Sequence, residues 1–316
     1  MPPRRKSPAP TRSTRVSASR AATGSGRAYK PHEVAAGQRG KIKTLAWVFA
    51  CAVTLFIFAA RWNAENQFSP SPSARRAVFA GCSFAVMCSC LLLELFWVPL
   101  PRDGPPHGSS TNALPDMKWV WQRTLLSDEC LYTVQTITLS TCTYLVWFVG
   151  EASLFTSMPQ YGALTVAYTL APVVSTMLVI LTPLFLMLCW WEPKWRRTVL
   201  APMERAKPGF GAVMLYEHCV ELPLGLGALL AVMERPLLIA VMPSARMLTW
   251  IGAGYSCLYV GLLYVMYSRF NVAVYPFVAD LHAVRPWPVG WLGFGGGISG
   301  LNVLALNLVA WLVGGP

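Results

Sequence analysis

Long apolar runs with few charges dominate this chain and limit the folds open to it more than any other feature. Because about 20 apolar residues suffice for a helix to cross a bilayer, each run is a candidate span. Only 13% of the residues are charged, about half the usual fraction of soluble domains. We predict an all-α, polytopic transmembrane helical bundle of about seven spans. The seven runs lie at about 44–62, 77–100, 118–149, 162–191, 209–233, 247–268 and 288–313.

A basic segment precedes these runs. Residues 1–43 carry eleven Lys and Arg against one acid, Glu33, and are rich in Ser, Pro, Ala and Gly. This composition predicts a disordered basic tail, with residues 44–313 forming the transmembrane helical domain. The tail either attracts anionic lipids, at roughly 1 kcal/mol per basic residue near the surface, or only fixes the topology. We expect no nucleic-acid partner.

The distribution of basic residues also predicts the orientation. With seven spans and a cytosolic N-terminus, 21 Lys and Arg fall on the cytosolic side and five on the other side. Cytosolic connections of membrane proteins carry the excess of Lys and Arg. The sequence therefore predicts a multi-pass protein of an endomembrane or the plasma membrane, with its tail in the cytosol and residue 316 on the opposite side.

Three ionisable residues interrupt the fifth run: Glu217, His218 and Glu221. Such residues inside a span are costly and usually mark a functional pathway. Their spacing lets all three share one helix face. They could form a proton or cation site, supply a general base at His218, or join helices through hydrogen bonds. We expect no metal or other cofactor, because helical metal sites draw ligands from several helices and no other histidine lies in a run.

Three further patterns stand out along the chain. Thr124 stands near the head of the third run, with Asp128 one turn deeper on the same face. It is either a helix-start residue or a nucleophile, which would need an adjacent base. The string Tyr275-Pro276-Phe277 predicts a helix end and a turn. Glycines at small-x-x-x-small spacing predict close helix packing at the start of the seventh run. They are Gly293, Gly296, Gly297 and Gly300.

The order of three strings resembles the androgen-induced gene family of multipass membrane hydrolases. The first is a Lys118-Trp119 start leading to Thr124, and the second runs from His218 through Glu221 to Leu222-Pro223. The third, Val274-Tyr275-Pro276-Phe277, is the most specific. The resemblance covers roughly residues 118–313 in patches. The first run has no counterpart, so this chain would add one N-terminal span to the family's usual six.

The resemblance implies an activity and a site. It implies hydrolysis of fatty-acid esters of hydroxy fatty acids, drawn from the bilayer, with Thr124 as nucleophile and His218 as its base. Asp128, Glu217 or Glu221 would hold the imidazole tautomer, as the third member of a triad does. The predicted topology puts Thr124 and the entry to the His218 helix on the same, cytosolic side. The alternative is a non-enzymatic, proton- or cation-coupled transporter that uses Glu217, His218 and Glu221.

Overall fold

Helices make up all the regular structure within the described part of the chain. The computed structural model describes residues 46, 49–59, 70–93, 132–193, 196–206, 208–270, 276–284 and 286–314. A short apolar helix, Phe49–Ala59, comes first. The other elements are α2 (Ala74–Leu92), α4 (Tyr132–Ser153), α5 (Tyr161–Phe185), η2 (Leu186–Trp190), η3 (Arg196–Leu200), α7 (Ala201–Ala206), α8 (Phe210–Cys219), α9 (Glu221–Gly227), η4 (Ala228–Val232), α10 (Arg235–Val241), α11 (Ala245–Phe270), α12 (Pro276–Ala283) and α13 (Val289–Gly314).

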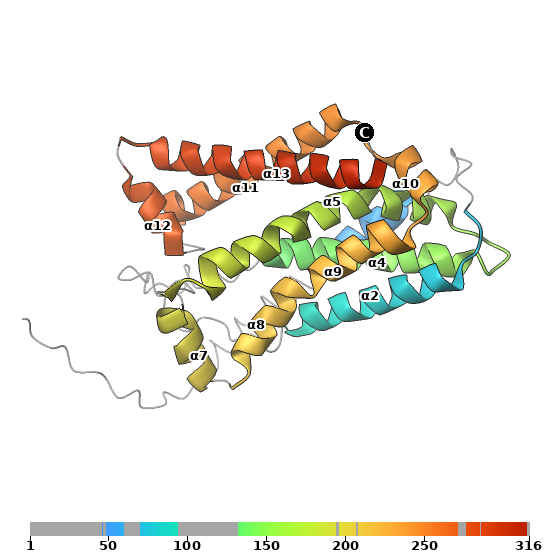
Figure 1. Ribbon diagram of the computed structural model, residues 1–316, viewed down its shortest axis with the longest axis horizontal. Coiled ribbons are helices and arrows are strands. Elements are labelled where there is room, and N and C mark those ends of the chain that lie inside the picture. The colour runs from blue at the N-terminus through green and yellow to red at the C-terminus, as the bar shows by residue number, and fades with distance from the viewer. Residues whose placement is uncertain are drawn as a thin grey trace, which may run out of the picture.

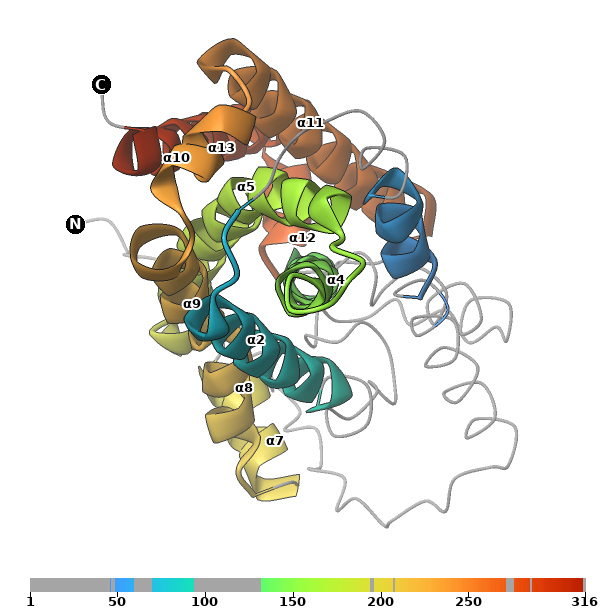
Figure 2. The same cartoon turned by 90° about the vertical axis from the view of Figure 1, so that its right-hand side faces the viewer.

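The long helices lie side by side along the longest axis of the molecule (Figure 1). Viewed along that axis, α4 is seen end-on between α2 and α5, and α11 and α13 lie beyond α5 (Figure 2). The most extensive helix contacts join α4 to α2 and α5, and α11 to α13. The bundle is therefore built around α4 and α5.

The central helix α4 combines large apolar side chains with many hydroxyls. Ile137 and Trp147 are fully buried in the core that α4 shares with α2 and α5. Several of its threonines are buried too. Thr141 Oγ1, for example, donates to the Ile137 carbonyl 2.7 Å away. A hydroxyl bonded to its own helix backbone can be buried without an unmet hydrogen bond, as at Thr141, whereas Ser140 Oγ and Thr143 Oγ1 of the same helix have no hydrogen-bond partner among the described residues.

Five helices of the described residues are long and apolar enough to cross a membrane. They are Ala74–Leu92, Tyr161–Trp190, Phe210–Val232, Ala245–Ser268 and Val289–Gly314. The 22-residue α4 packs among them. The predicted all-α, multi-pass membrane bundle is thus confirmed. The Phe49–Ala59 helix is shorter than a span, so the count of seven stays a prediction. The tail, residues 1–43, lies outside the described residues, and its proposed role stays a prediction as well.

Among the described residues, the glycines at the start of α13 do not mediate the close packing that their spacing predicts. A Cβ added at Gly293, Gly296, Gly297 or Gly300 would meet no described atom within 4 Å. The close approach of α11 and α13 occurs instead at Gly252, where a Cβ would lie 2.8 Å from Leu306 Cδ1. Spacing alone shows which residues share a face, but the face that meets a neighbour depends on the whole bundle.

The start of α8 is fixed by a carboxylate from the preceding helix. Glu204 accepts hydrogen bonds from the backbone N–H groups of Gly211 and Gly209, each 2.7 Å away. These two bonds hold the pKa of the Glu204 carboxyl below its ordinary value. Gly209 has φ +89°, a conformation that favours glycine. Glu204 and Gly209 therefore set the point where the His218 helix begins.

We expect Glu204→Gln to loosen this helix start. Because the pKa of Glu204 is lower in the folded protein, the stabilisation by its carboxylate is present above its unfolded-state pKa and is lost as pH falls through the folded value. At neutral pH the variant should show faster amide exchange at Gly209 and Gly211 than the wild type, measured by hydrogen exchange and mass spectrometry. On acidification the wild type should approach the variant. Equal exchange at neutral pH would contradict this role for Glu204.

Candidate functional site

His218 lies buried near the end of α8, where contacts from α5 hold it. Its ring stacks on the Phe185 ring, with centroids 3.9 Å apart and planes at 20°. Thr182 Oγ1 donates to the His218 carbonyl at 2.6 Å. The helix breaks at Val220, between α8 and α9, three residues before Pro223. A proline lacks the N–H that would continue the helical hydrogen bonds and clashes with the preceding turn. The ring and the backbone of His218 are thus both held by α5, next to the helix break at Val220.

The two ring nitrogens of His218 have different partners. Nδ1 lies 2.8 Å from the Met214 carbonyl oxygen, and Nε2 lies 2.9 Å from Thr133 Oγ1 on α4. A carbonyl oxygen only accepts, so Nδ1 carries the proton. Burial without a charged partner favours a neutral ring, and its Nε2 then accepts from the Thr133 hydroxyl. This pairs a hydroxyl with a base in the arrangement that nucleophilic catalysis requires.

Thr133 is a site residue that the sequence analysis missed. Its hydroxyl is one of several on α4, and Thr136, Thr138, Thr141 and Thr143 are buried in the same helix. No spacing or flanking motif separates Thr133 from these, because its contact with His218 joins residues 85 positions apart and forms only in the folded bundle. Thr124 and Asp128 lie outside the described residues, so their predicted roles stay predictions.

The carboxylates on the same helical segment do not hold the imidazole. The structure gives that role to the Met214 carbonyl, which corrects the assignment to Glu217 or Glu221. Both acids are fully buried. Neither Glu221 oxygen has a hydrogen-bond partner among the described residues. All three polar groups are buried, and the structure pairs the His218 imidazole with the Thr133 hydroxyl.

An apolar pocket of about 100 Å³ lies against the Thr133–His218 pair. Both residues line it, beside apolar side chains of α5 such as Leu181 and of α13 such as Phe294. Tyr255 and Asn302 line it as well. A hydroxyl–imidazole pair on an apolar wall inside a membrane bundle can meet a lipid without exposing the reacting atoms to bulk water. Among the described residues no group of three or more His, Cys, Asp or Glu is placed to hold a metal ion.

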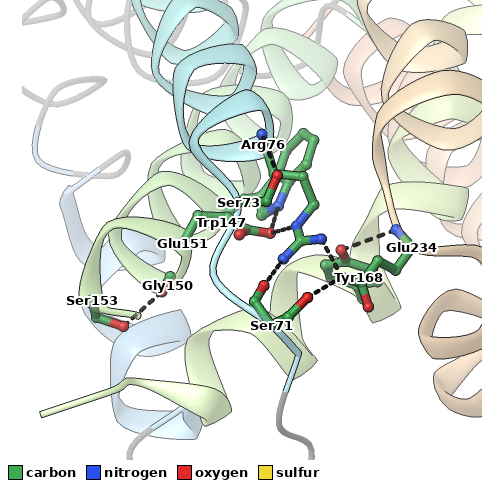
Figure 3. Close-up of polar contacts among 9 residues, drawn as sticks. All are labelled: Ser71, Ser73, Arg76, Trp147, Gly150, Glu151, Ser153, Tyr168 and Glu234. Atoms are coloured by element: carbon green, nitrogen blue, oxygen red, sulfur yellow. Dashed lines mark hydrogen bonds and ion pairs between the residues drawn. The ribbon is translucent and has the colours of Figure 1, made fainter. Parts of the chain in front are cut away.

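A second polar cluster lies at the far end of the bundle (Figure 3). Arg76 at the start of α2 donates through Nε to Glu151 Oε1 on α4 at 2.8 Å, and also pairs with Glu234 after η4. Trp147 Nε1 donates to the same Glu151 oxygen at 3.1 Å, and the Glu234 N–H donates to the Tyr168 hydroxyl at 3.2 Å. The cluster thus ties together α2, α4, α5 and the connection between η4 and α10.

The Arg76 cluster is separate from the His218 pair. The sixteen residues from His218 to Glu234 correspond to about 24 Å of helix. Arg76 and Glu151 are both buried, and their pairing explains how two charges are tolerated there. Arg76 is one of the five Lys and Arg residues predicted on the non-cytosolic side, and no sequence pattern indicated Glu151 or Glu234. One signal could have identified the pair of Arg76 and Glu151: they carry opposite charges at the start of the second apolar run and the end of the third, which meet if the two helices are antiparallel.

No protein-family description, curated protein or solved structure matches this chain.

Proposed function

We propose that this integral membrane protein hydrolyses lipid esters, with Thr133 as nucleophile and His218 as general base. The contact of 2.9 Å between Thr133 Oγ1 and His218 Nε2 carries the proposal. Three features support it: Nδ1 is occupied by the Met214 carbonyl, the pair lines an apolar pocket, and the bundle is of the membrane-spanning type. A buried, oriented imidazole that accepts a hydroxyl proton is a group that can activate that hydroxyl.

The reaction would proceed in two stages. His218 Nε2 takes the Thr133 proton as Thr133 Oγ1 forms a bond to the ester carbonyl carbon. The tetrahedral intermediate then collapses, and the leaving alcohol takes the proton from His218 while an acyl-threonine remains. Water, deprotonated by the same nitrogen, attacks the acyl carbon; the acyl–Oγ1 bond then breaks, His218 returns the proton to Thr133 Oγ1, and the acid is released. Met214 accepts from Nδ1–H throughout and so stabilises the imidazolium that forms at each stage.

Fatty-acid esters of hydroxy fatty acids are the substrate class that we propose. The class rests on the resemblance to the androgen-induced gene family. It agrees with the pocket, because such esters present long hydrocarbon chains on both sides of the scissile bond. The resemblance assigns the nucleophile to Thr124, whereas the described contact with His218 supports Thr133. One imidazole lone pair accepts one hydroxyl proton at a time, so the two assignments are exclusive for a given turnover.

The direct test measures hydrolysis by purified wild-type protein in detergent or nanodiscs. We expect release of fatty acid from these esters, together with covalent labelling by a fluorophosphonate probe. Release of fatty acid without labelling of the protein would restrict the mechanism to direct attack of water on the ester. If well-folded protein shows neither turnover nor labelling, the hydrolase proposal is wrong.

The alternative function, proton- or cation-coupled transport, has one observation in its favour: Glu217 and Glu221 are fully buried within a spanning segment. Buried carboxylates are common in proton pathways. A relay through His218 would require a hydrogen-bonded link from the imidazole to a carboxylate, and both ring nitrogens have other partners. Proton flux into liposomes that carry the purified protein tests this alternative. Flux that is lost in Glu221→Gln and kept in Thr133→Ala would favour transport over hydrolysis.

A further inference from the structure

A second pocket continues from the one at the Thr133–His218 pair. Its volume is about 180 Å³, and it lies among α4, α5, α11 and α13. Tyr255 and Asn302 line both pockets. On α5 the lining moves from residues 180–185 in the first pocket to 173–177 in the second. The second pocket therefore lies beyond the first along the bundle axis, in the direction of increasing residue number along α13.

The polar side chains that line the second pocket are already hydrogen-bonded within the protein. The Tyr255 hydroxyl donates to Gln135 Oε1 at 2.6 Å, and Thr176 Oγ1 donates to the Pro172 carbonyl at 2.8 Å. Asn302 Nδ2 donates to Ser256 Oγ and to the Ile298 carbonyl, at 2.8 and 3.1 Å. These polar groups therefore do not need a hydrogen bond from a ligand that enters the pocket. The other lining residues are Leu139, Val173, Met177, Ile251, Gly252 and Leu306.

This combination of size and lining favours hydrocarbon over water. A buried water usually needs two to four polar partners, and apolar cavities of about 150 Å³ stay dry and bind hydrocarbons. The surrounding bundle is of the membrane-spanning type, so acyl chains are the abundant hydrocarbons at this depth. The distance along α5 from Phe185 to Val173 is about 18 Å. Phe185 is the residue that stacks on His218. That length suits an extended acyl chain rather than a compact ligand.

We propose that the second pocket is an acyl-chain subsite. It would hold the distal part of a long fatty-acyl group whose carbonyl lies at the Thr133–His218 pair. The passage between Tyr255 and Asn302 admits the chain, and the wall at Val173 and Leu306 limits its length. This inference rests on the proposed hydrolase function for the placement of the carbonyl, but occupation of the pocket by a fatty acid does not require turnover.

Narrowing the subsite should change chain-length selectivity. Val173→Phe fills space in the second pocket and leaves the Thr133–His218 contact in place. We expect the ratio of kcat/KM for 4-nitrophenyl palmitate to that for 4-nitrophenyl butyrate to fall by about 10- to 100-fold, since hydrophobic pocket contacts discriminate by this order. The matched control is Leu304→Phe, because Leu304 on α13 is 68% exposed and lines neither pocket. It should leave the ratio as in the wild type.

A binding measurement separates the subsite from the catalytic proposal. Palmitic acid with a terminal diazirine would be photo-crosslinked to purified protein, and the adducts located by mass spectrometry. We expect adducts at Met177 or Ile251 in the wild type, reduced in Val173→Phe. Adducts without turnover of either ester would retain the subsite and reject the hydrolase. Turnover with an unchanged ester ratio in Val173→Phe and no adduct in the second pocket would overturn the subsite and retain the hydrolase.

Discussion

Replacing Thr133 by alanine should lower ester hydrolysis nearly as far as replacing His218 by alanine, by about 10² to 10⁴-fold. The two residues share one hydrogen bond and one proton, and members of such a pair act as a unit. The double variant should therefore be scarcely worse than either single one. Activity is measured as fatty acid released per folded protein, with fluorophosphonate labelling as a second readout. Thr133→Ser keeps a hydroxyl and should restore part of both signals.

Two control variants make this prediction specific. Thr141 is buried on the same helix, but its hydroxyl bonds the Ile137 carbonyl and it lines neither pocket. Thr141→Ala should therefore stay close to wild-type activity, which separates chemistry from general damage to α4. Thr124→Ala tests the nucleophile that the resemblance assigns. If Thr124→Ala is inactive and Thr133→Ala is active, Thr124 is the nucleophile and the described contact is a structural hydrogen bond.

Replacing Arg76 by methionine should be the most destabilising single change at the far end of the bundle. It leaves Glu151 buried without its guanidinium partner, and breaking a buried ion pair in this way costs about 3–5 kcal/mol. For a protein of this size that corresponds to a fall in apparent Tm of roughly 10 °C. The measurement is thermal unfolding of the purified protein in detergent, followed by tryptophan fluorescence and by loss of the monodisperse peak.

The charged residues around Arg76 differ in burial and in their partners, and these differences provide controls for this second prediction. Arg75→Met removes the neighbouring arginine, which is exposed and donates to the Ala231 carbonyl, so it should cost much less. Glu151→Gln leaves Arg76 paired with Glu234 and should be milder than Arg76→Met. Arg76→Met combined with Glu151→Gln should recover part of the lost stability, because no charge is then left unpaired beside Trp147. An Arg76→Met protein as stable as Arg75→Met would show that the cluster contributes little to folding.

The helical class and the position of His218 were predictable from the sequence. Bilayer thickness and the need to satisfy backbone groups leave few options for a chain with such apolar runs. The cost of an ionisable group in a span singles out His218, and the resemblance points to the same residue. Glu217 and Glu221 were also correctly expected to be interior. Each of these conclusions depends only on the composition and the residue spacing within a single segment of the chain.

The partners of these residues were decided by tertiary packing. Thr133 on α4 meets His218 on α8 only in the folded bundle, and nothing in its neighbours distinguishes it from Thr141. The Met214 carbonyl holds the imidazole, although carboxylates were the obvious candidates, because the ring folds back along its own helix. Arg76 meets Glu151 only when α2 and α4 run antiparallel. Hydrogen bonds and ion pairs act over about 3 Å, whereas Thr133 and His218 are 85 positions apart along the chain, and Arg76 and Glu151 are 75. Composition and spacing therefore indicated which groups are buried, and only the folded bundle determined which of them meet.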